Sequence, residues 1–110
     1  MKIYTMNPTI DVVETPVEET SRIIRHLHLG EGKMIPEHKA DALVTVVCLE
    51  GKVDFTASGQ TVQLVPGSFL TMEPNELHSL YGVKDSHVLV IQQLKYWMQK
   101  KSKNLEVIML

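Results

Sequence analysis

Short hydrophobic runs, each bounded by residues that favour turns, follow one another from about Ser21 onward. They are rich in Val, Ile, Leu, Phe and Thr, which suit the half-buried surface of a β-sheet. The runs occupy residues 23–29, 42–49, 52–56, 61–65, 69–72, 77–81 and 87–92. Short runs at such close spacing are typical of all-β domains. The pattern therefore predicts a chain made mostly of strands.

The breaks between the runs are suited to chain reversal. Glu50-Gly51 and Ser58-Gly59 each supply a glycine, which tolerates the positive φ of tight hairpin turns. Pro66-Gly67 and Pro74-Asn75 also favour turns. Many short antiparallel strands joined in this way indicate a sandwich, a jelly roll or a small barrel.

The two ends of the chain differ from this pattern. Residues 11–19 contain four acids around Pro16, which predicts an extended segment or loop that leads into the barrel. Near the other end, the spacing i, i+3, i+4 and i+7 is met by Leu94, Trp97, Met98 and Lys101. This spacing predicts a short terminal helix, with an additional edge strand as the alternative.

The composition is that of one compact domain. The 110 residues are 44% hydrophobic and 22% charged, with a formal net charge of -2, which argues against a disordered chain. We expect a single domain over residues 1–110, with its core at about 21–94 and extensions at 1–20 and 95–110.

Charge and cysteine content exclude several classes of partner. The chain lacks the basic excess and the aromatic residues of a nucleic-acid-binding domain. Its longest nearly apolar run, residues 42–49, is much shorter than the ~20 residues of a membrane-spanning helix. The only cysteine, Cys48, cannot form an internal disulfide, so we expect a cytoplasmic protein.

Histidine is the residue type most suited to chemistry in this chain, because imidazole binds metals and transfers protons near neutral pH. The histidines are His26, His28, His38, His78 and His87. His38 and His78 each follow a turn and lie just before or at the start of a strand. If His38 points inward, strand periodicity gives the barrel an apolar interior face that includes a thiol. The residues of that face are Ala40, Ala42, Val44, Val46 and Cys48.

The contexts of His38 and His78 resemble the two motifs of a small single-domain cupin, a conserved-barrel jelly roll of the RmlC-like type. The first motif runs Gly, five residues, His-X-His, three or four residues, Glu, six residues, Gly. Its frame is occupied here by Gly32, His38, Ala40, Val44 and Gly51. The second motif runs Gly, five residues, Pro-X-Gly, two residues, His, three residues, Asn. Its frame is occupied by Gly67 and His78, with Pro74 one place late, Asn75 or Glu76 for the Gly, and Gly82 for the Asn.

The resemblance covers roughly residues 21–94 and implies an all-β cupin double-stranded β-helix. In metal-binding cupins, the two histidines and the Glu of the first motif and the His of the second coordinate one metal ion. Carried over by position, this implies His38 and His78 as ligands of a divalent transition metal, while Ala40 and Val44 supply no donor. A catalytic metal usually has three protein ligands, so another side chain must substitute or the site holds no metal. The candidates are Cys48, Glu37, Asp41, Glu76, His26 and His28.

We interpret His38 and His78 as the polar anchors of a small-molecule pocket, since such pockets are mostly apolar with a few convergent polar groups. Met34, Met72 and Cys48 are predicted to line it, although packing is the commoner use of each. The alternative is that both histidines are hydrogen-bonded residues without a ligand.

The remaining histidines allow two interpretations. His26 and His28 share one face of a strand, at a spacing that permits shared coordination. If Leu27 and Leu29 point into the core, both histidines face outward, which is the simpler arrangement. His87 opens the last long run and is expected at the surface or at an edge.

Three classes of function follow. The first is a small-molecule-binding or sensing cupin with no evident catalysis. The second is an enzyme, either metal-dependent and of the dioxygenase or isomerase type, or metal-free with His38 or His78 as general base. The third is a structural or interaction protein that forms a homodimer, suggested by the methionines, Trp97 and the V-I-M-L ending.

Overall fold

The computed structural model describes residues 1–94, which form nine β-strands and no helix. The strands are β1 (Val13–Glu18), β2 (Arg22–Leu29), β3 (Met34–His38), β4 (Ala42–Glu50), β5 (Val53–Ala57), β6 (Gln60–Leu64), β7 (Phe69–Met72), β8 (His78–Gly82) and β9 (Ser86–Leu94). The predicted all-β class is confirmed. The predicted terminal helix or edge strand beyond Leu94 lies outside the described residues. Within the described part, no helix could cross a membrane.

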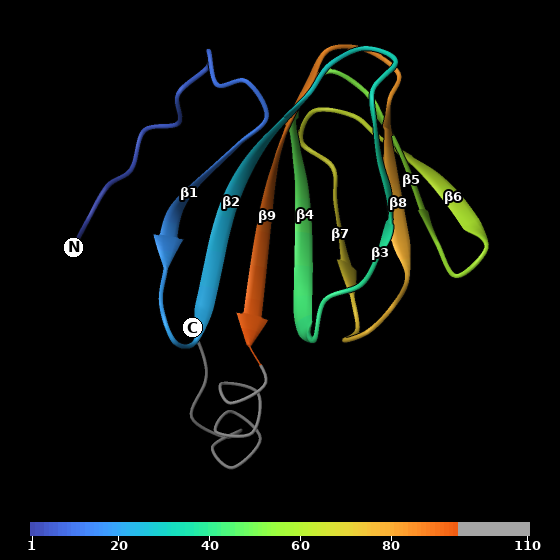
Figure 1. Cartoon of the computed structure of the whole chain (residues 1–110). Helices are drawn as coiled ribbons and strands as arrows, with labels where there is room; N and C mark the ends of the chain where they lie inside the picture. The colour runs from blue at the N-terminus through green and yellow to red at the C-terminus, as the bar shows by residue number, and fades with distance from the viewer. Residues whose placement is uncertain (95–110) are drawn as a thin grey trace.

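The strands form two antiparallel sheets that enclose the core. One sheet has the order β1-β2-β9-β4-β7 and the other the order β3-β8-β5-β6. Figure 1 shows the five-stranded sheet on the left and the four-stranded sheet on the right, joined by loops at the top and bottom. Within residues 1–94, β3 pairs only with β8, so no strand pairing joins β2 to β3. The molecule is therefore open between these two strands.

The core comes from the alternation of side chains that the sequence predicts. In β4, buried and half-buried residues alternate along the strand. Its inward residues pack against both sheets, in a cluster that includes Ala42, Val44, Val46, Cys48, Val53, Phe55, Leu80 and Val88. Each fully buried Val, Leu or Phe side chain of this cluster stabilises the fold by about 1.5–3 kcal/mol.

Two strands were not predicted. The segment expected to be extended or a loop contains β1, which pairs with β2. Only Val17 of β1 is buried, so its sequence carries no alternating hydrophobic signal. β3 contains Pro36, which cannot donate a ladder hydrogen bond, and the pairing with β8 shifts between Ile35 and His38. Both are edge strands that depend on backbone pairing more than on buried side chains.

A close approach of two turns fixes one end of the barrel. Ser86 is fully buried, and its hydroxyl accepts a hydrogen bond from Lys52 N at 2.9 Å and donates to Lys84 O at 2.7 Å. Gly51 lies against this clamp with φ of 85°. A Cβ at position 51 would overlap the Ser86 hydroxyl and the carbonyl of Asp85. Only glycine fits both the conformation and the space.

We expect Gly51→Ala to lower the free energy of unfolding by about 3 kcal/mol, the sum of a left-handed backbone penalty of about 1–2 kcal/mol and overpacking. Gly67→Ala is the matched control, because Gly67 has φ of 89° and nothing within 4 Å of its added Cβ. The control is expected to show only the backbone penalty. Urea unfolding followed by circular dichroism measures both, and equal losses would contradict the steric part of this explanation.

Candidate functional site

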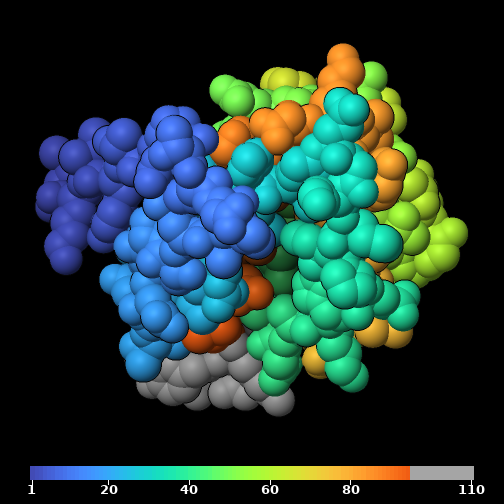
Figure 2. Space-filling view, turned by 45° about the horizontal axis from the view of Figure 1, so that its top comes forward, coloured from blue at the N-terminus to red at the C-terminus, as the bar shows by residue number. Residues whose placement is uncertain are grey.

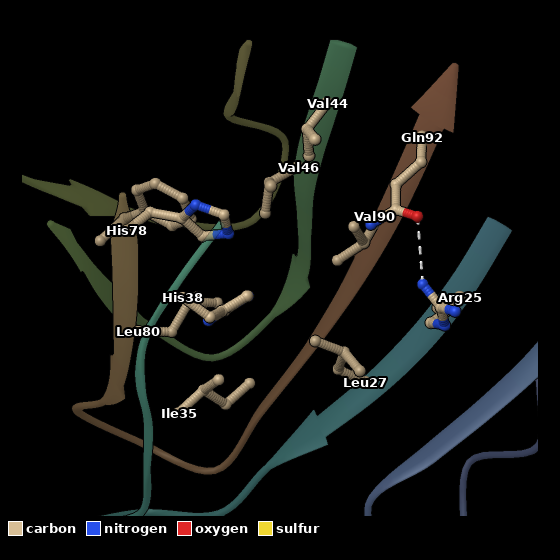
Figure 3. A pocket seen from close by; sticks show the side chains of 11 residues that line it. Arg25, Leu27, Ile35, His38, Val44, Val46, His78, Leu80, Val90 and Gln92 are labelled. Carbon is tan, nitrogen blue, oxygen red and sulfur yellow. Dashed lines mark hydrogen bonds between the residues drawn. The ribbon is translucent and has the colours of Figure 1, made fainter. Parts of the chain in front are cut away.

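A cavity of about 180 Å³ lies between the two sheets. Six strands line it, through Arg25, Leu27, Ile35, His38, Val44, Val46, Phe55, His78, Leu80, Val90 and Gln92. Figure 2 shows the molecule hollowed between the blue segment of the chain that includes β2 and the teal segment that includes β3. The lining is mostly hydrocarbon, with polar groups on two opposite walls (Figure 3).

His38 and His78 form the polar part of one wall. They are partners across the β3–β8 pairing, and their ring centroids lie 4.2 Å apart at an interplanar angle of 60°. Nδ1 of His38 donates a hydrogen bond to Pro36 O at 2.9 Å, and Nδ1 of His78 donates to Glu76 O at 2.8 Å. In a neutral ring, these bonds leave Nε2 as the acceptor. The structure thus brings together the two histidines singled out in the sequence.

Local backbone geometry puts His38 opposite His78. The register shift after Ile35 allows both Ile35 and His38 to line the cavity, although they are three residues apart. In a regular strand, residues at this separation would face opposite sides. The irregularity falls at Pro36, which has no N–H, and the freed Pro36 carbonyl instead orients the His38 ring.

His78 lies in apolar surroundings. It is only 6% exposed, and its ring stacks on Phe55 with centroids 5.6 Å apart. Burial lowers the pKa of His78 below its usual value, because the charged ring loses hydration there. The neutral ring can accept a hydrogen bond from a bound molecule.

Arg25 and Gln92 form the polar part of the opposite wall. Nη1 of Arg25 donates a hydrogen bond to Gln92 Oε1 at 3.2 Å, shown as a dashed line in Figure 3. No carboxylate among residues 1–94 forms an ion pair with Arg25. This pair was not predicted from the sequence. The inward position expected for Leu27 could have predicted that Arg25 also faces the cavity, since Arg25 lies two residues before it on the same strand.

Three residues predicted to line the pocket lie elsewhere. Met34 is 60% exposed, because it lies at the start of an edge strand. Met72 is buried but borders a different depression, near Phe55 and Glu76. Cys48 is part of the core, where its thiol donates to Glu50 O at 3.5 Å. Burial raises the pKa of Cys48, which keeps the thiol protonated.

The cavity does not supply the donor set of a cupin metal centre. Of the four positions implied by the resemblance, only His38 and His78 carry donors, while Val44 lines the cavity with hydrocarbon. Binding of a metal ion would need three or more histidine, cysteine or acidic side chains close to one another. Among residues 1–94, neither His38 nor His78 belongs to such a group. The guanidinium of Arg25 in the same cavity also repels a divalent cation. The described residues therefore do not fit a metal at this place.

The acidic candidates near the motifs have other contacts. Glu76 accepts hydrogen bonds from the Ser58 hydroxyl at 3.0 Å and from Glu73 N at 3.1 Å. Asp41 accepts one from the Asn75 amide at 3.5 Å. Backbone carbonyls, and not carboxylates, therefore orient both cavity histidines. This arrangement suits hydrogen bonding to a ligand more than the carboxylate-assisted proton transfer of a histidine base.

The other histidines face away from the cavity, as the inward position of Leu27 and Leu29 predicts. His26 and His87 are nevertheless not surface residues. His26 is 1% exposed and His87 is 9% exposed, because the N-terminal segment folds over them. The expectation that His87 lies at the surface or at an edge is therefore wrong, because it is buried and β9 is the middle strand of its sheet.

Comparison with protein families assigns the chain. The model of the AraC-like ligand binding domain matches residues 16–91, which is more than half of the chain. The chain belongs to this family. No curated protein matches this AraC-like ligand binding domain.

Solved structures share the fold of this AraC-like domain and confirm the predicted cupin jelly roll. An RmlC-like cupin from Methanocaldococcus jannaschii superposes with a TM-score of 0.77 at 18% identity, over 91% of this chain and 96% of that one. An RmlC-like cupin from Desulfovibrio desulfuricans gives 0.76 at 22% identity, over 84% and 96%. The DMSP lyase DddQ from Ruegeria pomeroyi gives 0.71 at 17% identity, over 76% of this chain and 47% of that one. At such identities, the likeness establishes the fold alone.

The lowered pKa of His78 predicts that this residue destabilises the AraC-like domain in mild acid, whereas the raised pKa of His28 acts in the opposite direction. Below the ordinary histidine pKa of about 6.5, the unfolded chain binds a proton that folded His78 does not take up. The titration of His78 therefore does not change the free energy of unfolding above that pH, and it lowers this free energy as the pH falls below it. We expect His78→Asn, whose amide can still donate to Glu76 O, to weaken the decline in unfolding free energy between pH 7 and pH 5.

Val90→Ala is the control, since it removes packing in the same cavity without removing a titratable group. It is expected to lower stability while leaving the pH dependence as in the unmodified protein. Urea unfolding at several pH values measures both variants. An unchanged slope in His78→Asn would disprove the assignment.

Proposed function

We propose that the cavity binds a small organic acid that carries a hydroxyl group and a short apolar body, without catalysing a reaction. The observation that supports this most is Arg25, a cation on the cavity wall that pairs with no carboxylate among the described residues. Arginine presents a planar set of donors that matches a carboxylate. An anionic ligand would supply the missing countercharge.

The facing wall favours the hydroxyl group. Nδ1 of each ring is bonded to a backbone carbonyl, so Nε2 is the atom that can accept a hydrogen bond when a ring is neutral. A hydroxyl group can donate to such a nitrogen, whereas a second carboxylate could not. The two walls therefore favour different ends of one molecule.

The size of the cavity limits the ligand. In another protein, an apolar cavity of about 150 Å³ holds benzene. The volume of about 180 Å³ therefore suits a ligand of about six to ten non-hydrogen atoms. Membership in a ligand-binding family also supports small-molecule binding. A cytoplasmic location and a homodimer stay predictions from the sequence.

Thermal shift and calorimetry with a matched panel test the proposal. The panel contains short hydroxycarboxylic acids, their neutral amides, and the same acids without the hydroxyl. We expect the hydroxy acids to raise the melting temperature more than the other two groups. The proposal fails if no acid stabilises the protein at 10 mM, or if acids and amides stabilise it equally.

Substitutions connect this binding to the walls. Arg25→Gln is expected to weaken acid binding by about tenfold or more, since hydrogen bonds to charged groups contribute about 1.5–3 kcal/mol. Arg22→Gln is the matched control, because Arg22 lies on the same strand but is exposed and pairs with Glu19. His38→Phe is expected to weaken the preference for the hydroxyl group, since it removes one of the two acceptors. Equal loss in both arginine variants would indicate a general charge effect instead of a site.

A further inference from the structure

A second group of polar side chains lies on the outer face of the five-stranded sheet. His28 of β2 and His87 of β9 are direct partners across the two strands, and Asp85 immediately precedes β9. One ligand atom from each of these residues lies within 4.8 Å of the others. Among residues 1–94, this is the only such group of three. It is separated from the cavity by the sheet itself.

A hydrogen-bonded chain orients His87. Nδ1 of His26 donates to Glu14 Oε1 at 2.8 Å, and this bond lowers the pKa of Glu14 and keeps its carboxyl ionised. With His26 neutral, its Nε2 accepts a hydrogen bond from Nδ1 of His87 at 2.8 Å. The lone pair of His87 is then on Nε2. Metal-binding histidines commonly have their other ring nitrogen held by a carboxylate or carbonyl. Here the His26 imidazole, itself bonded to the Glu14 carboxylate, holds that nitrogen of His87.

His28 is oriented by the N-terminal segment. Its Nδ1 donates to Ile10 O at 3.0 Å, and its Nε2 donates to Asp85 Oδ1 at 2.7 Å. The hydrogen bond to Asp85 raises the pKa of His28. The hydrogen bond to Ile10 O fixes the His28 ring so that its Nε2 lies next to the carboxylate of Asp85. A cation placed there would replace the proton between them.

We propose that Nε2 of His28, Nε2 of His87 and the carboxylate of Asp85 bind a divalent transition-metal ion, with Zn²⁺ as the best match. Two imidazoles and one carboxylate form a donor set that suits Zn²⁺, and the remaining coordination positions would take water. Asp85 is exposed, so ions have access from solvent. This site is distinct from the cupin ligand positions, none of which takes part in it.

Binding requires small local changes. Donors about 2.0–2.2 Å from a tetrahedral ion lie about 3.4 Å apart. Separations of up to 4.8 Å in this group must therefore shrink, whereas His28 Nε2 and Asp85 Oδ1, now 2.7 Å apart, must move apart slightly. The rings of His28 and His87 now stack, with centroids 4.6 Å apart and planes 5° from parallel. They must tilt so that both Nε2 atoms point to one centre. His28 releases its Nε2 proton to solvent as the metal–nitrogen bond forms.

The N-terminal segment completes the surroundings of this metal site. Ile10 O holds the His28 ring, and Asn7 N donates to the same Glu14 oxygen that holds His26, at 2.9 Å. A depression of about 210 Å³ beside His26 and His87 is bordered by Met6 and Pro8 of this segment. Because the N-terminal segment orients the ligands, metal binding must in turn stabilise the segment in this position.

Zn²⁺ titration of the chelator-treated, tag-free full chain tests the proposal. Isothermal calorimetry is expected to show one ion per chain. Asp85→Asn and His28→Gln are each expected to weaken binding by tenfold or more, and both positions are exposed enough for folding to be retained, which circular dichroism checks. Glu14→Gln is expected to weaken binding by about 10–100-fold through loss of ligand orientation. Hydrogen exchange at residues 7–12 should slow when Zn²⁺ binds.

Two control variants locate the ion. Glu37→Gln removes an exposed carboxylate far from this group and is expected to leave Zn²⁺ affinity unchanged. His38→Ala is also expected to leave it unchanged, whereas an ion bound in the cavity would be lost. The proposal is overturned if the folded protein binds no Zn²⁺ at 1 mM, if Asp85→Asn binds as tightly as the unmodified chain, or if His38→Ala alone abolishes binding.

Discussion

The pairing of β2 with β9 is the constraint on which both polar sites depend. This pairing runs without a shift from Arg22 opposite Gln93 to Leu29 opposite Ser86. Because side chains alternate along a strand, Arg25 faces the cavity while His26 and its neighbours of the same parity face the N-terminal segment. A slip of one residue would place the arginine outside and the imidazoles inside the barrel. One register thus determines two different chemical environments.

The two sites differ in what orients their imidazole rings. In the cavity, backbone carbonyls hold both rings, and the opposite wall carries a cation. On the outer face, the carboxylates of Glu14 and Asp85 contact histidines directly. The first arrangement favours a neutral or anionic guest, and the second favours a cation. Histidine content alone therefore does not specify the function of either site.

Much of the fold follows from the hydrophobic pattern, because the central strands bury one face. The convergence of His38 and His78 could be predicted because both follow turns in a recognisable motif frame. Arg25 was missed because a single charge within an apolar run is normally taken to face solvent. The burial of His87 could not be predicted, since the segment that covers it, which includes Met6 and Pro8, precedes the predicted strands and shows no strand periodicity. The alternation of side chains along the strand predicts that Cys48 points inward. How deeply it is buried depends on packing between the two sheets, which the sequence pattern does not give.

Pro36 has a consequence for how copies of this chain can associate. It lies in the middle of β3, an outer strand of the four-stranded sheet, and is followed by the exposed, charged Glu37. A strand without one amide donor, with a register irregularity beside it, is a poor template for a further strand. Extension of the sheet from one molecule into the next is therefore disfavoured along this border. The opening between β2 and β3 is thereby kept free of intermolecular β-pairing, and small molecules in solution retain access to the barrel.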